Sequence, residues 1–336
     1  MLTSELDYEL PEDLIAQSPA EPRDASRLMV VDASDGGISH HVFRDLPSFL
    51  APGDALVLNE TKVLPARMFA QRPGGGKVEM LFLRDLGSAS GGAWEALARP
   101  SKRLRPGLTL SAGGEKVEVV ERLGDGRWSI RGRDLPGLMR RAGRMPLPPY
   151  IQPTEAAEVA YQTVYAKTPG SAAAPTAGFH FTPETLAAVE RAGAGISRVT
   201  LHVGTGTFTP VRTERLEDHR MHAEHYSVPE STARTVEGAN RVVAVGTTVA
   251  RTLESRAASG EREGESTLFV YPGFRWRAVD ALLTNFHLPR STLLAMVMSF
   301  AGEDLVREAY RVAVENRYRF YSFGDAMLLL NGGRNR

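Results

Sequence analysis

The spacing of apolar positions changes several times along the second half of the chain. Apolar residues three or four apart predict helices, and short continuous or alternating apolar runs predict strands. In chain order the pattern predicts a helix at 183–192, a strand at 196–203, a helix at 229–239, a strand at 241–245, a helix from 247 to about 256, a strand at 281–286 and a helix at 292–300. Thr182 and Ser291 stand where helix N-caps are expected. This alternation predicts an α/β domain with a largely parallel or mixed sheet.

The N-terminal part of the chain carries strand signals of its own. Two β-rich runs, 27–32 and 38–43, flank Asp35-Gly36-Gly37, which is typical of a hairpin turn. A short apolar run at 55–59 predicts a buried strand. We therefore expect a discontinuous large α/β domain made of residues 1–61 and 149–336.

The segment 62–148 has a different pattern. Short β-rich runs are separated by glycine-rich turns, and they lie at 77–84, 93–99, 108–111, 116–121 and 128–131. Strands of this length and spacing predict a small β-barrel or sandwich. A proline-rich stretch at 145–150 suits a rigid linker out of it. The predicted fold class is an α/β (mixed α+β) large domain with an inserted small, all-β, barrel-like domain.

Charge separates the two predicted domains. The chain has 40 Lys and Arg against 40 Asp and Glu and is formally neutral. Residues 62–148 carry 17 basic against 8 acidic residues, a net +9, and the remainder carries 23 against 32, a net −9. A basic insert favours association with a polyanion such as a nucleic acid. The alternative is that its arginines lie singly on solvated faces.

Composition excludes several other classes. With 42% hydrophobic and 24% charged residues, the 336-residue chain is typical of a globular protein. It has no cysteine, which excludes disulfides, thiolate catalysis and cysteine-ligated metal sites. The longest apolar stretch, 293–298, is too short to span a bilayer, and the acidic N-terminal segment does not resemble a signal peptide. We expect a cytoplasmic protein with no membrane partner.

A run of small residues at 169–180 is a candidate ligand-binding loop. It is rich in Gly, Ala, Ser and Pro and leads into the helix predicted from Pro183. Small side chains let backbone N–H groups approach a ligand, and a helix N-terminus favours anions. A flexible linker is the alternative, although Pro169 and Pro175 stiffen the run.

Two further predicted strands end in glycines and hydroxyls. The sequence HVGTGTF at 202–208 runs into a glycine-rich turn, but it lacks the third glycine of a dinucleotide fingerprint. Gly246, Thr247 and Thr248 follow a strand and begin a helix, which is typical of a nucleotide-binding corner in α/β sheets. A Walker-type phosphate loop is absent from the sequence.

The histidines between residues 219 and 225 are the other candidates for chemistry. His219, His222 and His225 are three apart, but a helix would turn the third away from the first, so we expect no metal site. If the segment is instead a strand, His222 and Glu224 share one face, where a carboxylate can orient an imidazole. They are our candidates for proton transfer or hydrogen bonding, with a merely polar surface as the alternative.

Several longer motifs extend over nearly the whole chain in order. They are QSPAEPRDASRL at 17–28, LNETKVLPAR at 58–67, RPSK at 99–102, PPYI at 148–151, YQTVYA at 161–166, PTAGFHF at 175–181, HVGTGTF at 202–208, MHAE at 221–224, VGTTVAR at 245–251, TNFHLPRSTLL at 284–294 and YRFYSFGDAM at 318–327. On these motifs the chain closely resembles the S-adenosylmethionine:tRNA ribosyltransferase-isomerases of bacterial queuosine biosynthesis. Phe179 stands where Leu is usual in that family, and Phe274 where Tyr is common.

The resemblance implies an enzyme that transfers and rearranges the ribosyl group of S-adenosylmethionine onto 7-aminomethyl-7-deazaguanine at the tRNA wobble position. The products would be epoxyqueuosine, adenine and methionine, with S-adenosylmethionine consumed as a co-substrate and no metal required. The family fold, an α/β domain with an inserted barrel-like domain, agrees with the pattern above. We expect a monomer whose partners are the anticodon region of tRNA and S-adenosylmethionine.

The resemblance also directs attention to particular residues. For S-adenosylmethionine we expect the three glycine- or hydroxyl-bearing segments to contribute, namely Ser171, Thr176, Gly178, His180, His202, Gly204, Gly206, Thr207, Gly246, Thr247 and Thr248. For tRNA phosphates we expect Arg99, Lys102 and Arg103. The rival hypotheses are an S-adenosylmethionine-dependent RNA methyltransferase, whose usual Gly-x-Gly-x-Gly loop is missing, and a non-catalytic tRNA-binding protein.

Overall fold

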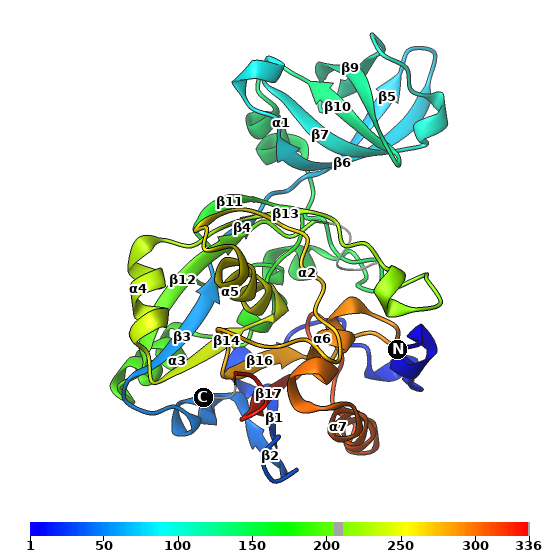
Figure 1. The fold of residues 1–336 in the computed structure, drawn as a ribbon. Coiled ribbons are helices and arrows are strands. Elements are labelled where there is room, and N and C mark those ends of the chain that lie inside the picture. The colour runs from blue at the N-terminus through cyan, green and yellow to red at the C-terminus, as the bar shows by residue number, and fades with distance from the viewer. Residues whose placement is uncertain (205–210, 335–336) are drawn as a thin grey trace.

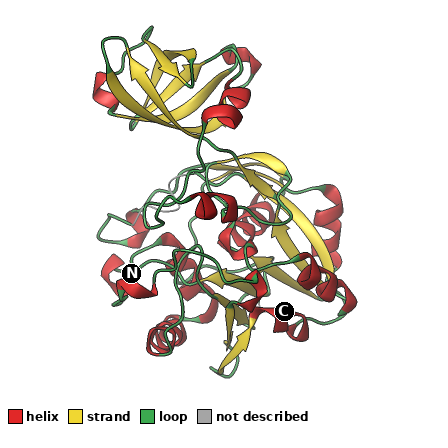
Figure 2. Cartoon of the chain, turned by 180° about the vertical axis from the view of Figure 1, so that it is seen from behind, coloured by secondary structure: helices red, strands yellow, loops and turns green. Residues whose placement is uncertain are grey.

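The computed structural model describes residues 1–204 and 211–334. They form a large α/β domain and a small β-barrel, which stands above the large domain on a narrow neck (Figure 1). The same separation is visible from behind (Figure 2). The predicted fold class is confirmed.

The large domain is built on a nine-stranded mixed sheet with the strand order β15-β13-β12-β3-β14-β16-β17-β1-β2. The strands are β1 Arg27–Asp32, β2 Ile38–Val42, β3 Asp54–Asn59, β12 Gly195–Leu201, β13 Glu224–Ser227, β14 Arg241–Val245, β15 Glu263–Ser266, β16 Ala281–Asn285 and β17 Ala326–Leu330. β12, β3, β14 and β16 run parallel to one another. β1 and β2 form the predicted antiparallel hairpin, and β1 lies parallel to β17.

Helices cover both faces of this sheet. On one face Val57 and Val199 pack in a cluster that includes residues of α4, α5, α6 and α7. On the other face Leu56 and Leu58 pack with α3 and a 3-10 helix at Phe43–Phe49. The helices are α3 Pro183–Arg191, α4 Glu230–Gly238, α5 Thr247–Ser259, α6 Thr292–Ala301 and α7 Glu303–Glu315. Burial on both faces explains why these strands read as continuous apolar runs.

The expected helix caps are confirmed. The hydroxyl of Thr182 accepts a hydrogen bond from the backbone N–H of Thr185 at 3.2 Å, and that of Ser291 accepts one from Leu294 at 3.1 Å. Both satisfy a donor that the first helical turn leaves unpaired. The sequence pattern did not predict β15, β17 or α7.

The barrel is closed and six-stranded, with the order β10-β7-β6-β5-β8-β9. Its strands are β5 Arg67–Arg72, β6 Gly76–Asp85, β7 Ala93–Arg99, β8 Thr109–Ala112, β9 Glu115–Gly124 and β10 Arg127–Arg131. All lie inside the predicted insert, and Val78, Met80 and Phe82 of β6 alternate into its core. A helix, α1 Leu135–Ala142, packs on this core and is capped by Asp134. Neither α1 nor β5 was predicted.

The neck consists of two chain segments that are tied together. The outgoing segment leaves β4 Thr61–Val63, which pairs with β11 Thr168–Ser171 at the top of the large domain (Figure 1). Arg67 and Arg144 then exchange backbone hydrogen bonds of 3.1 and 2.8 Å, joining the outgoing and returning segments. The returning segment passes through the proline-rich stretch at 145–150 to the short helix α2 Glu155–Ala160. None of the described helices is long and apolar enough to cross a membrane.

Candidate active site

Two adjoining hollows lie at the carboxyl ends of parallel strands in the large domain. β14 ends at Val245, directly before Gly246, and β16 ends at Asn285. The first hollow is lined by Met221, Thr247, Thr248, Arg251, Leu268, Phe269, Val270, Thr292, Leu293 and Met296. The second is lined by Ala174, Pro175, Thr176, Ala177, Val203, Gly246, Thr247, Thr248, Thr284, Asn285, His287 and Leu293. This end of an open α/β sheet is where such folds bind ligands.

The two hollows share Thr247, Thr248 and Leu293 and form one continuous cleft. Their volumes are about 10 and 40 Å³, which is room for one water and a few waters, respectively. At these volumes neither hollow, as the structure has it, holds a nucleoside.

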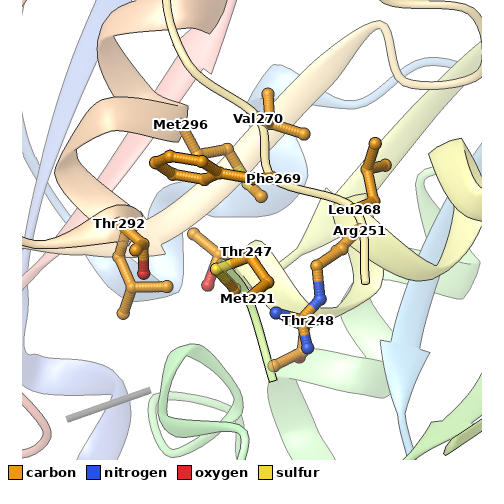
Figure 3. Close-up of a pocket in the computed structure, with 10 residues that line it drawn as sticks. Met221, Thr247, Thr248, Arg251, Leu268, Phe269, Val270, Thr292 and Met296 are labelled. Carbon is orange, nitrogen blue, oxygen red and sulfur yellow. The ribbon is translucent and has the colours of Figure 1, made fainter. Parts of the chain in front are cut away.

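The first hollow combines an apolar wall with one charged side chain (Figure 3). Phe269, Val270 and Met296 form the apolar side, and Arg251 reaches in from α5 below them. Arg251 is 5% exposed, and burial lowers the pKa of its guanidinium to about 10. It therefore remains charged at neutral pH.

Arg251 forms a buried ion pair with Glu224, the first residue of β13. Glu224 also accepts a hydrogen bond from the backbone N–H of Gly204 at 2.7 Å. Within the described residues, Nε of Arg251 has no hydrogen-bond partner. Losing one member of a buried pair typically costs about 3–5 kcal/mol because the other charge stays buried. The pair thus fixes the chain at Gly204, beside the cleft.

The second hollow is bordered by a chain of buried polar side chains. Thr176 donates to Oδ1 of Asn285 at 3.1 Å, and Nδ2 of Asn285 lies 3.1 Å from Nε2 of His180. Nδ1 of His180 lies 2.8 Å from the hydroxyl of Ser26. Burial lowers the pKa of His180 to about 3, so its imidazole is neutral at physiological pH. In this neutral form one ring nitrogen of His180 donates and the other accepts, so the ring joins Asn285 to Ser26.

His287 is also a buried, hydrogen-bonded histidine. Its Nε2 lies 2.7 Å from the hydroxyl of Thr284, and burial lowers the pKa of the imidazole to about 3. Both His287 and Thr284 line the second hollow. This histidine is therefore also a neutral hydrogen-bonding group near pH 7.

Ser171 holds the small-residue loop against Val203 beyond β12, and His202 contacts the neighbouring strand β4. The hydroxyl of Ser171 donates to the carbonyl of Ala173 at 2.6 Å and accepts from the N–H of Val203 at 2.9 Å. Nδ1 of His202 lies 2.8 Å from the hydroxyl of Thr61. These contacts position Ala173 and the residues that follow it along the second hollow.

The structure therefore brings together some of the predicted cofactor residues. Thr176, Gly246, Thr247 and Thr248 line the cleft directly. The others shape its surroundings: Gly178 leaves room for the hydroxyl of Tyr165, with which any Cβ at this position would collide. Gly206 and Thr207 lie outside the described residues. Arg251 and Asn285, in contrast, were not singled out by sequence reasoning, although both lie in the motifs that carry the family resemblance.

His222 and Glu224 are placed differently from the expectation. β13 begins only at Glu224, so His222 precedes the strand and does not share its alternation. His222 is exposed, next to Met221 of the first hollow, whereas Glu224 is buried against Arg251. Glu224 is therefore oriented by Arg251 and Gly204. Within residues 1–204 and 211–334, no three His, Asp or Glu side chains gather closely enough to hold a metal ion.

The three predicted tRNA contacts lie together on the barrel. Arg99 ends β7, and Lys102 and Arg103 belong to the 3-10 helix Ser101–Arg103. All three are exposed, and none forms an ion pair with a described acidic residue. Arg99 also lines a hollow of about 320 Å³ between the barrel and the large domain, together with Arg67, Glu79, Leu81, Leu97, Pro146, Leu147, Pro148, Pro149 and Ala172.

Comparisons with known proteins agree with this arrangement. A family model described as "Queuosine biosynthesis protein" matches residues 3–329. A relative from Rubrobacter xylanophilus is 76% identical over 336 residues, covering 100% of this chain and 99% of the relative. A relative from Thermotoga maritima is 50% identical over 339 residues, covering 98% and 100%. Both are named S-adenosylmethionine:tRNA ribosyltransferase-isomerase.

A solved structure gives the same result. The crystal structure of S-adenosylmethionine tRNA ribosyltransferase from Thermotoga maritima matches with a TM-score of 0.56 and 40% identity, covering 97% of this chain and 100% of that one. The chain belongs to the queuosine biosynthesis protein family, and within it to the S-adenosylmethionine:tRNA ribosyltransferase-isomerases. The sequence-based assignments to this family and to an enzyme are confirmed.

The buried histidines make stability depend on pH. His180 and His287 have folded-state pKa values of about 3, against 6.5 when unfolded. Above pH 6.5 neither state binds these protons, so there is no effect. As the pH falls from 6.5 towards 3, only the unfolded chain binds them, and stability is lost by about 1.4 kcal/mol per pH unit for each histidine.

We expect this slope in urea unfolding measured between pH 6.5 and 5, and no contribution from these two histidines between pH 7.5 and 6.5. His180→Gln should reduce the slope by about 1.4 kcal/mol per pH unit, whatever it does to the absolute stability. The control Ser231→Ala changes an exposed residue without a titratable side chain, so the slope should stay the same. An unchanged slope in His180→Gln would contradict the buried neutral imidazole.

Proposed function

We propose that this chain transfers and rearranges the ribosyl group of S-adenosylmethionine onto 7-aminomethyl-7-deazaguanine at the wobble position of tRNA, releasing adenine and methionine and leaving epoxyqueuosine. The observation that carries the proposal is the cleft at the carboxyl ends of β14 and β16, which is built from the same motifs as the family resemblance. Its hydroxyls, fixed amide and buried cation suit a charged nucleoside. The family's named relatives support the same reaction.

In this proposal the cleft binds S-adenosylmethionine. Thr176, Gly246, Thr247 and Thr248 contact it directly, because they line the cleft. The remaining candidates act through the walls. Ser171 holds the small-residue loop and His202 contacts Thr61 of β4. His180 holds Asn285, and Gly204 is fixed by Glu224. Gly178, Gly206 and Thr207 complete the proposed set. The walls exclude water from the reacting centre, which suits a reaction with hydrolysable intermediates.

The barrel is proposed to hold the anticodon region of tRNA. The segment 62–148, which contains the barrel, carries a net charge of +9 within a formally neutral chain, and Arg99, Lys102 and Arg103 offer unpaired cations on its surface. Arg99 also borders the hollow beside the neck, on the way to the large domain. We further propose a cytoplasmic monomer, since tRNA is a cytoplasmic substrate and both proposed sites lie within one chain.

Proton transfer is assigned to His222, with Glu224 in a supporting role. His222 is exposed beside Met221 at the mouth of the first hollow, where a base could reach a proton of the co-substrate. The sulfonium acidifies its neighbouring C5′ protons, so a moderate base is sufficient. Glu224, held by Arg251, keeps the chain at Gly204 in place beside it.

Isotopic labelling tests the proposed reaction. Unmodified precursor tRNA is incubated with S-adenosylmethionine labelled either in the ribose or in the methyl group. We expect only the ribose label to enter the RNA, with one adenine released per label. Methyl label in the RNA would identify a methyltransferase, and no label of either kind would leave a tRNA-binding protein.

Charge reversal tests the barrel surface. Replacing Arg99, Lys102 and Arg103 by Glu should weaken tRNA binding and lower the slope of log K against log salt by about 0.7–0.9 for each phosphate that is no longer neutralised. The matched control replaces Arg191, Arg234 and Arg262, which are exposed on the large domain, by Glu. If the two triple variants bind tRNA equally well at physiological salt, the RNA docks elsewhere.

Single-turnover kinetics test His222. His222→Ala should slow adenine release by at least about 100-fold, because general acid–base catalysis typically contributes 10²–10⁴-fold. The tRNA affinity should not change. His225→Ala serves as the control, since that ring is exposed and faces Glu263 on the surface. A loss of only a few-fold, with an unshifted pH–rate profile, would show that another residue moves the proton.

A further inference from the structure

The hollow beside the neck, here called the neck hollow, is large enough for a base. Its volume is about 320 Å³, and small-molecule sites in proteins begin at about 300 Å³. One wall is the outer face of the barrel, made of Arg67 on β5, Glu79 and Leu81 on β6, and Leu97 and Arg99 on β7. Strand pairing aligns these residues in two neighbouring rows, Arg67-Leu81-Leu97 and Glu79-Arg99. The wall therefore combines apolar, cationic and anionic side chains within a small area.

The opposite wall connects the neck hollow to the cleft of the large domain. It consists of the returning segment 146–149 and of Ala172 in the small-residue loop. Ala174 of the same loop lines the second hollow of the cleft. Two residues of chain span at most about 7 Å, so the two spaces lie on either side of one short stretch of backbone. A base in the neck hollow is thus close to the proposed co-substrate site.

Glu79 offers a fixed hydrogen-bond acceptor to this hollow. Its Oε1 lies 3.4 Å from Nε of Arg67, whose Nη2 donates to the carbonyl of Leu147 at 3.3 Å. Arg67 is its one ion-pair partner within residues 1–204 and 211–334. The Glu79 side chain is 39% exposed, and a carboxylate has about four positions that accept hydrogen bonds. Glu79 is therefore held by Arg67 and can still accept from a ligand.

A group that only accepts hydrogen bonds distinguishes the RNA bases by their donors. Guanine presents two adjacent donors, N1–H and its 2-amino group, which one carboxylate can accept together. Adenine and cytosine each place an amino donor beside an accepting ring nitrogen, and uracil has a single N–H between two carbonyls. 7-Aminomethyl-7-deazaguanine keeps the guanine donors but has lost N7, so the usual arginine contact to O6 and N7 is not available to it. Its recognition must use the edge that a carboxylate fits.

The surroundings of Glu79 suit single-stranded RNA. Arg99, opposite Glu79 in the strand pairing, is exposed and has no described acidic partner, so it can neutralise a phosphate. Phe69, opposite Glu79 on the other side, is 55% exposed and is the one exposed aromatic side chain in the described part of the chain. Cations that follow the backbone and aromatic rings that stack on bases are the two elements of single-strand binding.

We propose that the neck hollow receives the substrate base of the tRNA, with Glu79 accepting hydrogen bonds from its N1–H and 2-amino group and Arg67 acting as a positioning residue for Glu79. This inference rests on the proposed function. Leu81 and Leu97 lie against the base, and Phe69 stacks on the adjoining one. The five-membered ring, which bears the aminomethyl group, is at the end of the base away from Glu79. That end faces the wall containing Ala172, beyond which lies the cleft.

Binding measured without S-adenosylmethionine tests the recognition. Two anticodon stem-loops carry 7-deazaguanine or 7-deazahypoxanthine at the wobble position, and these bases differ only in the 2-amino group. The wild-type protein should bind the first at least about tenfold more tightly, because it loses a hydrogen bond to a charged acceptor with the second. Glu79→Met removes the acceptor and keeps the length, so this ratio should fall below about threefold. The control Glu121→Met, at an exposed barrel glutamate, should retain the wild-type ratio.

Phe69→Ala separates recognition of the base from general attachment of RNA. It should weaken binding of both stem-loops by at least about fivefold, since stacking on an aromatic ring is lost, and leave their ratio unchanged. Each ratio is taken within a single variant, so a lower overall affinity or stability does not affect it.

The remaining outcomes decide against the inference in distinct ways. A wild-type ratio below threefold, or an undiminished ratio in Glu79→Met, would overturn it. If Glu79→Met instead abolishes discrimination at another unpaired position of the loop, a neighbouring base occupies the hollow, and the assignment to the substrate base is wrong. If the wild-type enzyme transfers no ribose label to tRNA, the proposed function fails, whereas the binding ratio still reports on the hollow. If transfer is intact and the ratio is absent, the inference alone fails.

Discussion

The sheet of the large domain is covered by helices on both faces, so polar groups can gather only where its strands end. β12, β3, β14 and β16 run parallel, which brings their carboxyl ends to a common edge. At that edge lie the Gly246–Thr248 corner and Asn285, from segments far apart in sequence. A charge buried there needs an opposite charge beside it, and Arg251 and Glu224 provide this for each other as an ion pair. The position of the cleft thus follows from the helices that bury both faces of the sheet.

The buried polar groups hold neighbouring residues in place, whereas the groups that react are expected elsewhere. His180 and His287 are locked in the neutral state by burial, so they serve as fixed hydrogen-bonding groups throughout the physiological pH range. Glu224 is committed to Arg251 and to the backbone of Gly204. A buried polar group without a hydrogen-bond partner lowers the stability of the fold. A rigid polar wall, however, orients a ligand without having to rearrange during the reaction. Groups that exchange protons are then expected at the cleft's mouth.

The sequence predicted most of the fold because burial imposes regular patterns. The hairpin, the strands β3, β14 and β16, and the caps Thr182 and Ser291 all follow from apolar runs and turn residues. β5 was missed because only Met68 and Ala70 face the barrel core, and the exposed Phe69 between them breaks the alternation of apolar and polar residues. Within the site, the glycines and threonines were recognisable from composition. Arg251 and Asn285 were not, since their importance comes from contacts with residues distant in sequence.

The two-stranded neck has a kinetic consequence for a substrate that touches both domains. Since Arg67 and Arg144 bind each other's backbone, the barrel is joined by a short, double connection instead of a single flexible linker. Under the proposed binding of tRNA to the barrel, this connection would restrict the anticodon to a limited volume near the large domain and raise the effective concentration of its base at the cleft. In that case weak contacts between the cleft and the base would be sufficient, and product release would follow dissociation of the tRNA phosphates from the barrel.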